Sequence, residues 1–504
     1  MRVLTLVALL LAPAALQAQL PVSEIEHRLR PAVKLAGRPD TAFSIAERMR
    51  YYHVPAISVA VVENGRIVFA KGYGVAQFGG STPVDTTTLF LAGSISKPVA
   101  ATGILKQVED GRLPLDADVN SVLKSWKLPE SPHTATEKVT LRRLLTHTAG
   151  LTVWGFPGYR HDAPVPTVQQ LLDGAPPANT AAVRNDIPPG TMWRYSGGGI
   201  TIAQLMSEEV AGEPFARVME RLVLRPSGMT RSTFENPLPA ARHGEAASGH
   251  ERIDTPVPGR FHTYPEMAAA GLWTTAPELA RWAIALSRAY NGEQGGAISP
   301  AMARQMIAKH AQQKPPYGNG HWGLGVAVGG EGDSISFSHG GRDEGFVATF
   351  TMWPKLGRGI FILTNGVSGP MMTEIQRAFG EVTGMPAPPR QERTVVSIEP
   401  ATLAPLAGRY ALPRGGDTVM LEVSWDDADG LTLFDPGAQR LLQLMHEGNG
   451  VFFDPSSGQR LSFEREGSEP TARGSAIVLQ AGQQRVVAPR EDPVPGPRAE
   501  SPRR

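Results

Sequence analysis

With 504 residues, of which 41% are hydrophobic, the chain is long enough to bury a large core and to form two domains. Basic and acidic residues nearly balance, and a formal net charge of +1 does not predict a nucleic-acid partner. The absence of cysteine excludes disulfides, thiolate metal sites and a cysteine nucleophile, and the histidines lack metal-ligand spacing, so we expect no metal and no cofactor.

Residues 1–18 predict a secretory signal peptide. Arg2 supplies the charged start, residues 3–11 form an apolar core, and Ala18 is a small residue suited to cleavage before Gln19. The apolar run is too short to span a bilayer, and no later run is long enough. The sequence therefore predicts a secreted or periplasmic protein without a transmembrane anchor and without a cysteine for a lipid anchor.

The next elements predict one sheet with helices around it. Residues 56–76 predict a β-hairpin, in which Asn64 and Gly65 form a two-residue turn. After residue 330, short alternating runs predict further strands at 334–337, 346–352 and 359–363. Strands near both ends of this region predict a single sheet, and helices between them would cover its faces or form a lobe of their own. The predicted helices are 99–110, 139–151, 167–173, 200–210, 214–222, 277–290 and 300–310.

A second unit follows the first domain, which we place at residues 25–385. Residues 386–400 are rich in proline and charge and predict a linker. Residues 401–489 hold about eight short strand-like runs separated by turn residues, which is typical of a small β-barrel or sandwich. Residues 490–504, rich in proline, arginine and glutamate, predict a disordered tail.

Ser94 and Lys97 stand three residues apart at the start of the helix predicted at 99–110. This spacing puts the hydroxyl and the amine on one helical face. A helix N-terminus favours developing negative charge, and an amine that relays a proton can activate the hydroxyl as a nucleophile. The pattern alone is weak, because Ser121 and Lys124 repeat it and solvated polar residues are the commoner explanation.

Two later segments add chemistry. Tyr195 precedes a run of glycines, and near a lysine ammonium its phenolate would be favoured, so that it could take the Ser94 proton and return it to a leaving group. Residues 339–342 end a predicted strand, where glycines allow close backbone approach and a strand edge can offer an N–H to an oxyanion. Taken singly, these features are more often a packing tyrosine and a tight hairpin turn.

Taken together, the segments Ser94-Ile95-Ser96-Lys97, Tyr195-Ser196-Gly197 and His339-Gly340-Gly341 resemble the motifs of the penicillin-recognising serine hydrolases. The resemblance is strongest to the branch of class C β-lactamases, D-stereospecific peptidases and esterases, and it covers residues 40–380. It implies an α/β fold, with a β-lactamase-like antiparallel sheet, flanking helices and an all-helical lobe. Residues 401–489 resemble the lipocalin-like domain often appended to such hydrolases, a small all-β barrel.

The resemblance also implies roles for single residues. Ser94 would be the acylated nucleophile, and Lys97 and Tyr195 would share the proton transfers. The backbone N–H groups of Ser94 and Arg342 would form the oxyanion hole. The remaining substrate-binding positions would be Gly197, His339, Gly340 and Gly341.

Two departures from the family pattern shape the functional hypothesis. Many relatives carry asparagine where Gly197 stands, and many carry Lys-Thr-Gly where this chain has His339-Gly340-Gly341. Both changes remove groups that hold an acylamino carboxylate, and a histidine is mostly neutral at pH 7. We therefore expect a serine hydrolase that forms an acyl-enzyme on Ser94 and cleaves small esters or D-residue amides and peptides.

Two alternatives stay open at this point. One is a β-lactamase or D-Ala-D-Ala carboxypeptidase, and the other is a non-catalytic cell-wall or peptide-binding protein that retains the fold. The expected partners are a small-molecule ester, amide or peptide substrate, with contact to the cell wall, and no nucleic acid.

Overall fold

The computed structural model describes residues 20–491, except 253–254, 315–318, 415–416, 428–429, 437–439 and 482–483. The predicted signal peptide and residues 492–504 of the predicted tail lie outside the described residues. Arg490, the first residue of that tail, forms an isolated β-bridge with Tyr410. In the described part of the chain, no helix is both long and apolar enough to cross a membrane.

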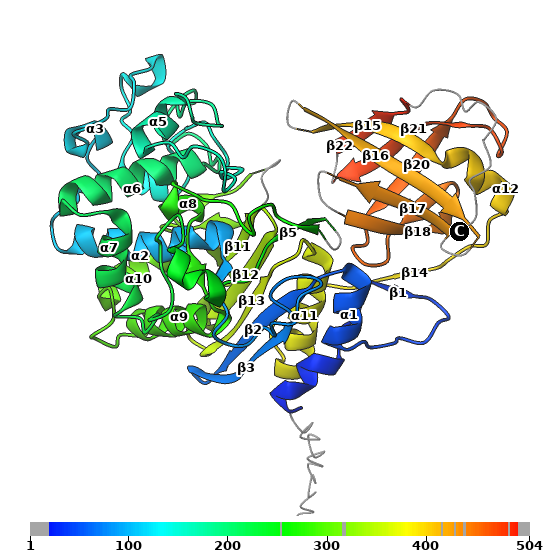
Figure 1. Ribbon diagram of the computed structural model, residues 1–504, viewed down its shortest axis with the longest axis horizontal. Coiled ribbons are helices and arrows are strands. Elements are labelled where there is room, and N and C mark those ends of the chain that lie inside the picture. The colour runs from blue at the N-terminus through cyan, green and yellow to red at the C-terminus, as the bar shows by residue number, and fades with distance from the viewer. Residues whose placement is uncertain are drawn as a thin grey trace, which may run out of the picture.

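An antiparallel sheet of eight strands is the centre of the larger unit (Figure 1). The predicted hairpin forms β2 (Ala56–Glu63) and β3 (Arg66–Gly74), and β2 pairs with the late strand β13 (Arg358–Thr364). The prediction of one sheet built from both ends of the region is thereby confirmed. The strand order is β3-β2-β13-β12-β11-β10-β9-β8. The other strands are β8 (Ala311–Gln312), β9 (His321–Trp322), β10 (Ala327–Gly329), β11 (Ser336–Asp343) and β12 (Phe346–Trp353).

Helices cover both faces of this sheet (Figure 1). On one face α9 (Ala276–Tyr290) contacts β2, β3 and β13, and on the other α11 (Gly369–Thr383) packs with α1 (Ile45–Tyr52). The remaining helices of this unit gather beyond α9 into a helical lobe. They are α2 (Ser96–Glu109), α3 (Val119–Val122), α4 (Leu141–Leu145), α5 (Val168–Asp173), α6 (Gly197–Ala211), α7 (Phe215–Met219), α8 (Met267–Ala270) and α10 (Pro300–Ile307).

The start of α6 differs from the sequence prediction. The helix predicted from residue 200 begins at Gly197, so the glycines that follow Ser196 form its first turn. The cause is an N-cap: the Ser196 hydroxyl accepts a hydrogen bond from the Gly199 N–H at 2.9 Å, which satisfies one of the free donors of the first turn. This cap fixes the backbone directly after Tyr195.

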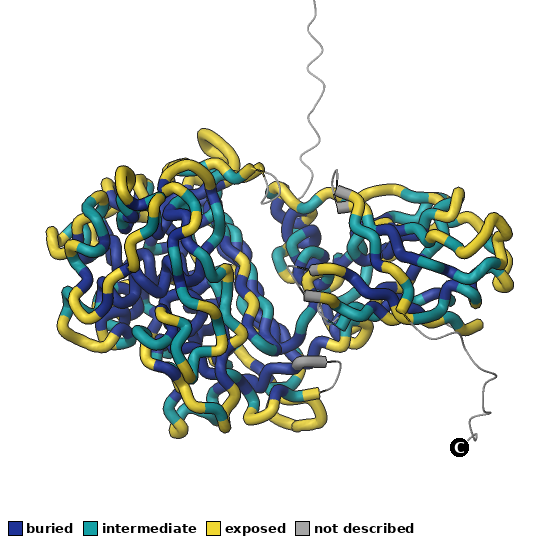
Figure 2. Tube along the Cα trace, turned by 90° about the horizontal axis from the view of Figure 1, so that it is seen from above, coloured by how far each residue is buried: buried dark blue, intermediate teal, exposed yellow. Residues whose placement is uncertain are grey.

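Strand alternation separates two apolar cores, and Figure 2 shows buried residues gathered inside the body and exposed residues along its outer loops. Along β2, Ala60 and Val62 belong to the core shared with the helical lobe, whereas Ile57, Val59 and Val61 belong to the core beneath α1 and α11. Successive side chains of a strand point to opposite faces of the sheet. Because helices cover both faces at β2, both sets of its side chains are buried, and its sequence is a nearly continuous apolar run.

The C-terminal unit is a second eight-stranded antiparallel sheet in the order β15 to β22, with β22 returning beside β15. This confirms the predicted all-β barrel, and its interior is packed with apolar side chains such as Leu421 and Ile477. The segment expected to be a linker contains β14 (Gln391–Arg393), which pairs in parallel with β1 (Val33–Leu35). Short α12 (Pro400–Leu403) follows. The strands are β15 (Gly408–Arg414), β16 (Asp417–Asp426), β17 (Gly430–Asp435), β18 (Arg440–Gly448), β19 (Val451–Phe453), β20 (Arg460–Arg465), β21 (Gly474–Ala481) and β22 (Gln484–Pro489).

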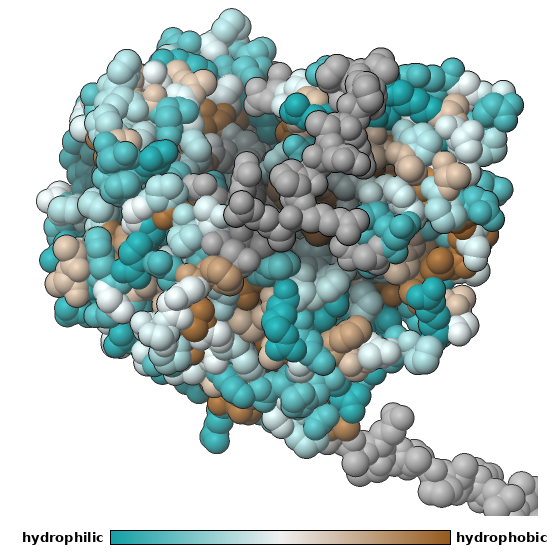
Figure 3. Space-filling model, turned by 45° about the vertical axis from the view of Figure 1, so that its right-hand side comes forward, coloured by the Kyte–Doolittle hydropathy of each residue, from teal (hydrophilic) through white to brown (hydrophobic). Residues whose placement is uncertain are grey.

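Polar contacts join the two units. Arg393 of β14 donates a hydrogen bond to Glu447 of β18 at 2.8 Å, and the N–H of Ala32 donates to the Ser456 carbonyl at 3.3 Å. Hydrophilic side chains dominate the face shown in Figure 3, and hydrophobic ones lie among them in small groups.

Candidate active site

Ser94 lies on a tight turn between a short strand and the helix α2. Strand β4 (Phe90–Leu91) leads into the 3₁₀ turn η2 (Gly93–Ile95), and α2 begins directly afterwards at Ser96. Gly93 has a φ of +53°, and a Cβ there would lie 2.4 Å from the backbone nitrogen of Arg342. Only glycine suits that position, because it combines left-handed backbone with close approach of another strand.

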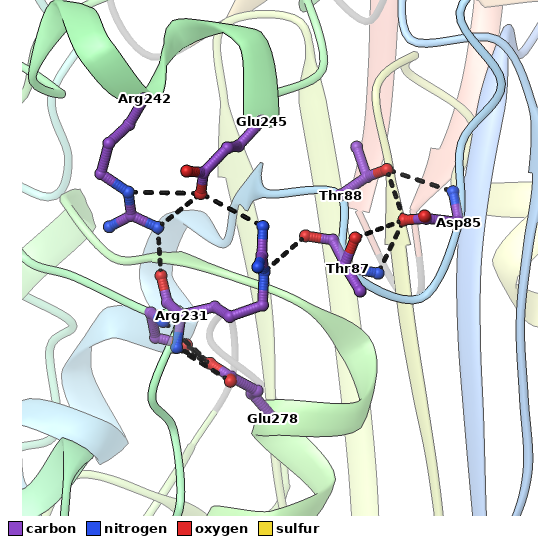
Figure 4. A network of polar contacts seen from close by, with 8 residues as sticks. Asp85, Thr87, Thr88, Arg231, Arg242, Glu245 and Glu278 are labelled. Carbon is purple, nitrogen blue, oxygen red and sulfur yellow. Dashed lines mark hydrogen bonds and ion pairs between the residues drawn. The ribbon is translucent and has the colours of Figure 1, made fainter.

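A polar network holds the segment that precedes β4 (Figure 4). Arg231 donates to the Thr87 carbonyl at 3.2 Å and to Glu245 at 3.2 Å, and its own backbone N–H donates to Glu278 of α9 at 2.9 Å. Asp85 accepts hydrogen bonds from the Thr87 backbone and from both nearby threonine hydroxyls. Through Arg231, the segment around Thr87 is thus connected to α9 a few residues before Ser94.

The structure brings Lys97 against Ser94. The Lys97 Nζ lies 2.9 Å from the Ser94 Oγ and donates a second hydrogen bond to the Ala269 carbonyl at 2.7 Å. Lys97 is only 2% exposed, and burial lowers its pKa to about 7, although the carboxyl groups of Asp343 and Glu266 act in the opposite direction. A large fraction of this amine is therefore unprotonated at neutral pH and able to accept a proton.

Glu266 and Asp343 are two buried acids that the sequence analysis did not single out. Glu266 is fully buried and Asp343 is 4% exposed. Burial raises the pKa of Glu266 to about 8 and that of Asp343 well above its usual value, so both are largely neutral at pH 7. Strand alternation could have found Asp343, which shares a face of β11 with His339, but no local signal marked Glu266.

Tyr195 lies on the other side of the lysine. The Lys97 Nζ is 4.9 Å from the centre of the Tyr195 ring, and the tyrosine hydroxyl is buried. Burial raises the pKa of Tyr195 above its usual value, and the neighbouring Ser94 hydroxyl lowers it by less. The expectation that a lysine ammonium would favour the phenolate is therefore wrong: the hydroxyl stays protonated and is suited to donating a proton.

Aromatic rings pack around Tyr195. His147, from the segment after α4, lies with its ring 4.3 Å from the Tyr195 ring and 5.1 Å from that of Trp322. Its Nδ1 accepts the Ser196 N–H at 3.2 Å, and burial keeps its pKa well below the usual value, so the ring is neutral. His339 contacts the same cluster, with its ring 5.4 Å from Trp322. These contacts hold the tyrosine in place.

The strand β11 presents its backbone to Ser94. Its pairing with β10 ends at Ser338, so the rest of that edge lies outside the ladder. On its other edge β11 pairs with β12, and Asp343 and Phe346 form the hydrogen-bonded pair that closes their two-residue turn. Backbone N–H groups point to alternate edges along a strand, so the N–H of the preceding residue, Arg342, points to the unpaired edge beside Ser94. A Cβ on Gly341 would lie 1.9 Å from the Ala92 carbonyl oxygen, which shows how closely β11 and η2 approach. The N–H groups of Ser94 and Arg342 thus come from two segments in contact.

His339 and Gly197 differ from what a carboxylate-binding site would need. Burial lowers the pKa of His339 to about 3, and its Nδ1 lies 2.5 Å from the Gly340 carbonyl, so the ring is neutral across the physiological range. At Gly197, a Cβ would lie 2.8 Å from the Phe156 ring and 3.1 Å from the Trp154 carbonyl. Phe156 therefore occupies the space that a side chain at residue 197 would take.

These groups share one cavity of about 610 Å³. Ser94, Lys97 and Tyr195 line it together with all three residues of the 339–341 segment and Arg342. The loop holding Trp154 and Phe156 forms an aromatic wall that the sequence analysis missed, and Gly197 lies behind it. The second serine–lysine pair is elsewhere: Ser121 and Lys124 are exposed, and the Ser121 hydroxyl donates to Asp118.

We expect Gly341→Ala to lower the acylation rate strongly. The added methyl group would overlap the Ala92 carbonyl, and the displacement of β11 would move the Arg342 N–H relative to that of Ser94. Loss of one oxyanion donor costs roughly 10²- to 10³-fold in kcat. Single-turnover acylation kinetics measure the effect, and circular dichroism monitors folding. Gly244→Ala is the matched control, because a Cβ there would meet nothing within 4 Å and the residue does not line the cavity; an equal loss in both variants would contradict the prediction.

Comparison with known families finds that the Beta-lactamase family model matches residues 44–381. Among curated proteins, esterase EstB of Burkholderia gladioli is 27% identical over 384 residues, covering 69% of this chain and 95% of the esterase. Penicillin-binding protein 4 of Amycolatopsis lactamdurans is 28% identical over 380 residues, covering 72% and 95%. Unguisins hydrolase ungD of Aspergillus violaceofuscus is 25% identical over 256 residues, covering 48% and 44%.

Solved structures share the fold. The octameric penicillin-binding protein homologue of Pyrococcus abyssi superposes with a TM-score of 0.59 at 22% identity, covering 88% of this chain and 98% of the homologue. A structure of SurE with D-Leu gives a TM-score of 0.54 at 21% identity, covering 89% and 97%.

Proposed function

The chain belongs to the β-lactamase family, and on this premise we propose that it is a serine hydrolase whose own Ser94 receives the acyl group of the substrate. We propose that its preferred substrates are small esters. The observation that carries the proposal is the contact of 2.9 Å between the Ser94 hydroxyl and the buried amine of Lys97, whose pKa is about 7. Residues 25–385 would carry the activity. Residues 1–18 would act as a signal peptide and direct the protein to the periplasm or the exterior. We propose that the protein contacts the cell wall there.

The residues fit a two-step acyl transfer. The unprotonated Lys97 amine takes the Ser94 proton as the serine oxygen attacks the scissile carbonyl. The backbone N–H groups of Ser94 and Arg342 stabilise the oxyanion, which needs no side-chain reorganisation. Tyr195, held protonated by burial, gives its proton to the departing alcohol or amine and is reprotonated through Lys97. Water then cleaves the acyl-enzyme by the same groups acting in reverse.

Two features support an ester preference over β-lactams and D-residue peptides. Phe156 fills the space beside Gly197, so no side-chain amide holds a substrate amide there. His339 is neutral, with a pKa of about 3, so it supplies no cation. A site that lacks partners for buried polar substrate groups discriminates against them strongly. Small D-residue amides are the second candidate substrates, since SurE, which shares the fold, was solved with D-Leu.

A labelling experiment tests the mechanism and a substrate panel tests the preference. A fluorophosphonate probe should label one residue per chain, and peptide mapping should place the label on Ser94. An unlabelled protein that still binds cell-wall peptides would instead support a non-catalytic binder. The panel compares p-nitrophenyl acetate, a chromogenic cephalosporin and a D-Ala-D-Ala peptide by kcat/KM. A higher value for the cephalosporin or the peptide would overturn the ester preference and leave the Ser94 mechanism standing.

The lysine pKa predicts how activity depends on pH. Because Lys97 accepts a proton only when unprotonated, and its pKa is lowered to about 7, kcat/KM should rise about tenfold per pH unit below pH 7 and level off above it. Phenyl acetate hydrolysis between pH 5 and pH 9, followed by titration of the released acid, measures this profile. A rate independent of pH over that range would exclude Lys97 as the proton acceptor.

A further inference from the structure

The cavity beside Ser94 carries a large aromatic side chain that is open to solvent. Trp154 lines the cavity and is 71% exposed, and its ring centre lies 5.6 Å from that of Tyr195. Phe156 lines the same cavity two residues later and is half-buried against the start of α6. The proposed mechanism gives neither ring a role. Covering the exposed indole with an apolar substrate group is favourable, because both surfaces are then removed from water.

The backbone under Trp154 is fixed by the first turn of α6. The Gly197 N–H donates to the Trp154 carbonyl at 3.0 Å, and the Gly198 N–H donates to the Val153 carbonyl at 3.1 Å. A helix leaves the donors of its first turn without partners inside the helix, so these two N–H groups are able to bind another segment. The exposed ring therefore belongs to a backbone that is held at two consecutive residues.

The two glycines allow this close approach. A Cβ at Gly197 would lie 3.1 Å from the Trp154 carbonyl and 2.8 Å from the Phe156 ring, and a Cβ at Gly198 would lie 3.2 Å from the Thr152 carbonyl. Glycine is among the weakest helix formers, so two glycines at the start of α6 destabilise that helix. The packing of the 152–156 segment against the first turn explains why they stand there.

Val153 has a strained backbone directly before Trp154. Its φ is +60°, in the left-handed region that β-branched residues rarely occupy. Such strain persists where the surroundings fix the conformation, here through the hydrogen bond from Gly198, and it is concentrated at ligand-binding and catalytic sites. Strained backbone, two hydrogen bonds from α6 and an exposed indole therefore coincide in one turn of the cavity wall.

We infer that the Trp154 ring binds an aromatic group of the substrate by stacking, so that the preferred esters carry an aryl group next to the scissile bond. This inference rests on the proposed acylation of Ser94 and narrows its substrate class to small aryl-bearing esters. An indole on a fixed backbone is suited to this role, because it presents a large flat apolar face and loses little conformational freedom on binding. An aryl group on the acyl part or on the alcohol part of the ester would make the same contact.

Two pairs of esters, each an aromatic compound and its saturated counterpart, test the inference. Trifluoroethyl phenylacetate is compared with trifluoroethyl cyclohexylacetate, which differs only in the acyl part. Benzyl acetate is compared with cyclohexylmethyl acetate, which differs only in the alcohol part. The aryl preference is the kcat/KM of the aromatic ester divided by that of its saturated partner, so a general effect of a variant on acylation cancels. Titration of the released acid measures the rate for all the esters.

We expect the aryl preference of at least one pair to fall about 3- to 10-fold in Trp154→Leu, which keeps an apolar side chain and removes the ring, as is typical of a lost aromatic contact. Trp154→Phe keeps an aromatic ring and should retain most of the preference. The pair that responds identifies the part of the ester that lies on the ring. Phe78→Leu is the matched control, because Phe78 is also an exposed aromatic residue but does not line the cavity.

Aryl preferences in Trp154→Leu within about twofold of wild type in both pairs would overturn the inference, as would an equal fall in Phe78→Leu. Fluorophosphonate labelling of Ser94 separates this failure from a failure of the proposed function. Labelled protein whose aryl preferences do not change in Trp154→Leu removes the inference alone. Protein that is neither labelled nor active on any of these esters removes the proposed function, and the inference falls with it.

Discussion

Replacement of Ser94 by alanine is expected to abolish ester turnover and fluorophosphonate labelling while leaving the fold intact. The hydroxyl is the acceptor of the acyl group in the proposed mechanism, and removal of a nucleophile costs roughly 10⁴- to 10⁶-fold in kcat. Loss of a single half-buried oxygen makes little cavity, so the thermal midpoint should move by a few degrees at most. The release of p-nitrophenol from p-nitrophenyl acetate measures kcat, and a thermal melt measures the midpoint of unfolding.

The chain offers its own control for this experiment. Ser121 belongs to a second serine–lysine pair with the same spacing, but its hydroxyl donates to the Asp118 carbonyl at 2.6 Å and Lys124 contacts Glu209 at the surface. Ser121→Ala should therefore retain wild-type activity and labelling. Inactivity of the Ser121 variant together with an active Ser94 variant would show that the wrong serine had been assigned.

Lys97→Ala and Tyr195→Phe are each expected to lower the acylation rate by roughly 10²- to 10⁴-fold, the usual effect of losing an acid–base group. Their effects should not multiply in the double variant, because Lys97 and Tyr195 flank one hydroxyl and pass the same proton. Single-turnover acylation rates of wild type, the two single variants and the double variant form a double-mutant cycle that measures this coupling.

The two variants should also differ in their pH profiles. Tyr195→Phe keeps the lysine amine and should retain the rise in rate below pH 7, whereas Lys97→Ala should lose it. Glu208→Gln serves as the control, since Glu208 is a partly buried acid in α6 whose pKa is raised to about 7 but which lies outside the cavity. A double variant whose loss equals the product of the single losses would contradict a shared proton path.

Local pattern determined much of the fold. The two-residue turn at Asn64-Gly65 and the alternation around it predict the first hairpin, because turn chemistry and side-chain period act over a few residues. The spacing of Ser94 and Lys97 likewise places both side chains on one side of a helical turn, and the structure joins them at 2.9 Å. Residues 401–489 show their strands in the same way, through short apolar runs separated by turns.

Other features depend on contacts between segments far apart in the chain. The helix predicted from residue 200 begins at Gly197, because the Ser196 hydroxyl caps it there, and Phe156 from another segment covers this glycine. The pairing of β14 with β1 joins residues more than three hundred positions apart, which no local pattern reveals.

The chemistry of the site was decided only by the tertiary structure. A lysine near a serine is visible in the sequence, but its pKa of about 7 comes from burial, which outweighs the opposite effect of the carboxyl groups of Asp343 and Glu266. The same burial keeps Tyr195 protonated, where local reasoning favoured its phenolate. Sequence alone thus indicated the groups that we propose for the chemistry, and the tertiary structure set their protonation states, because desolvation depends on every segment packed around a charge.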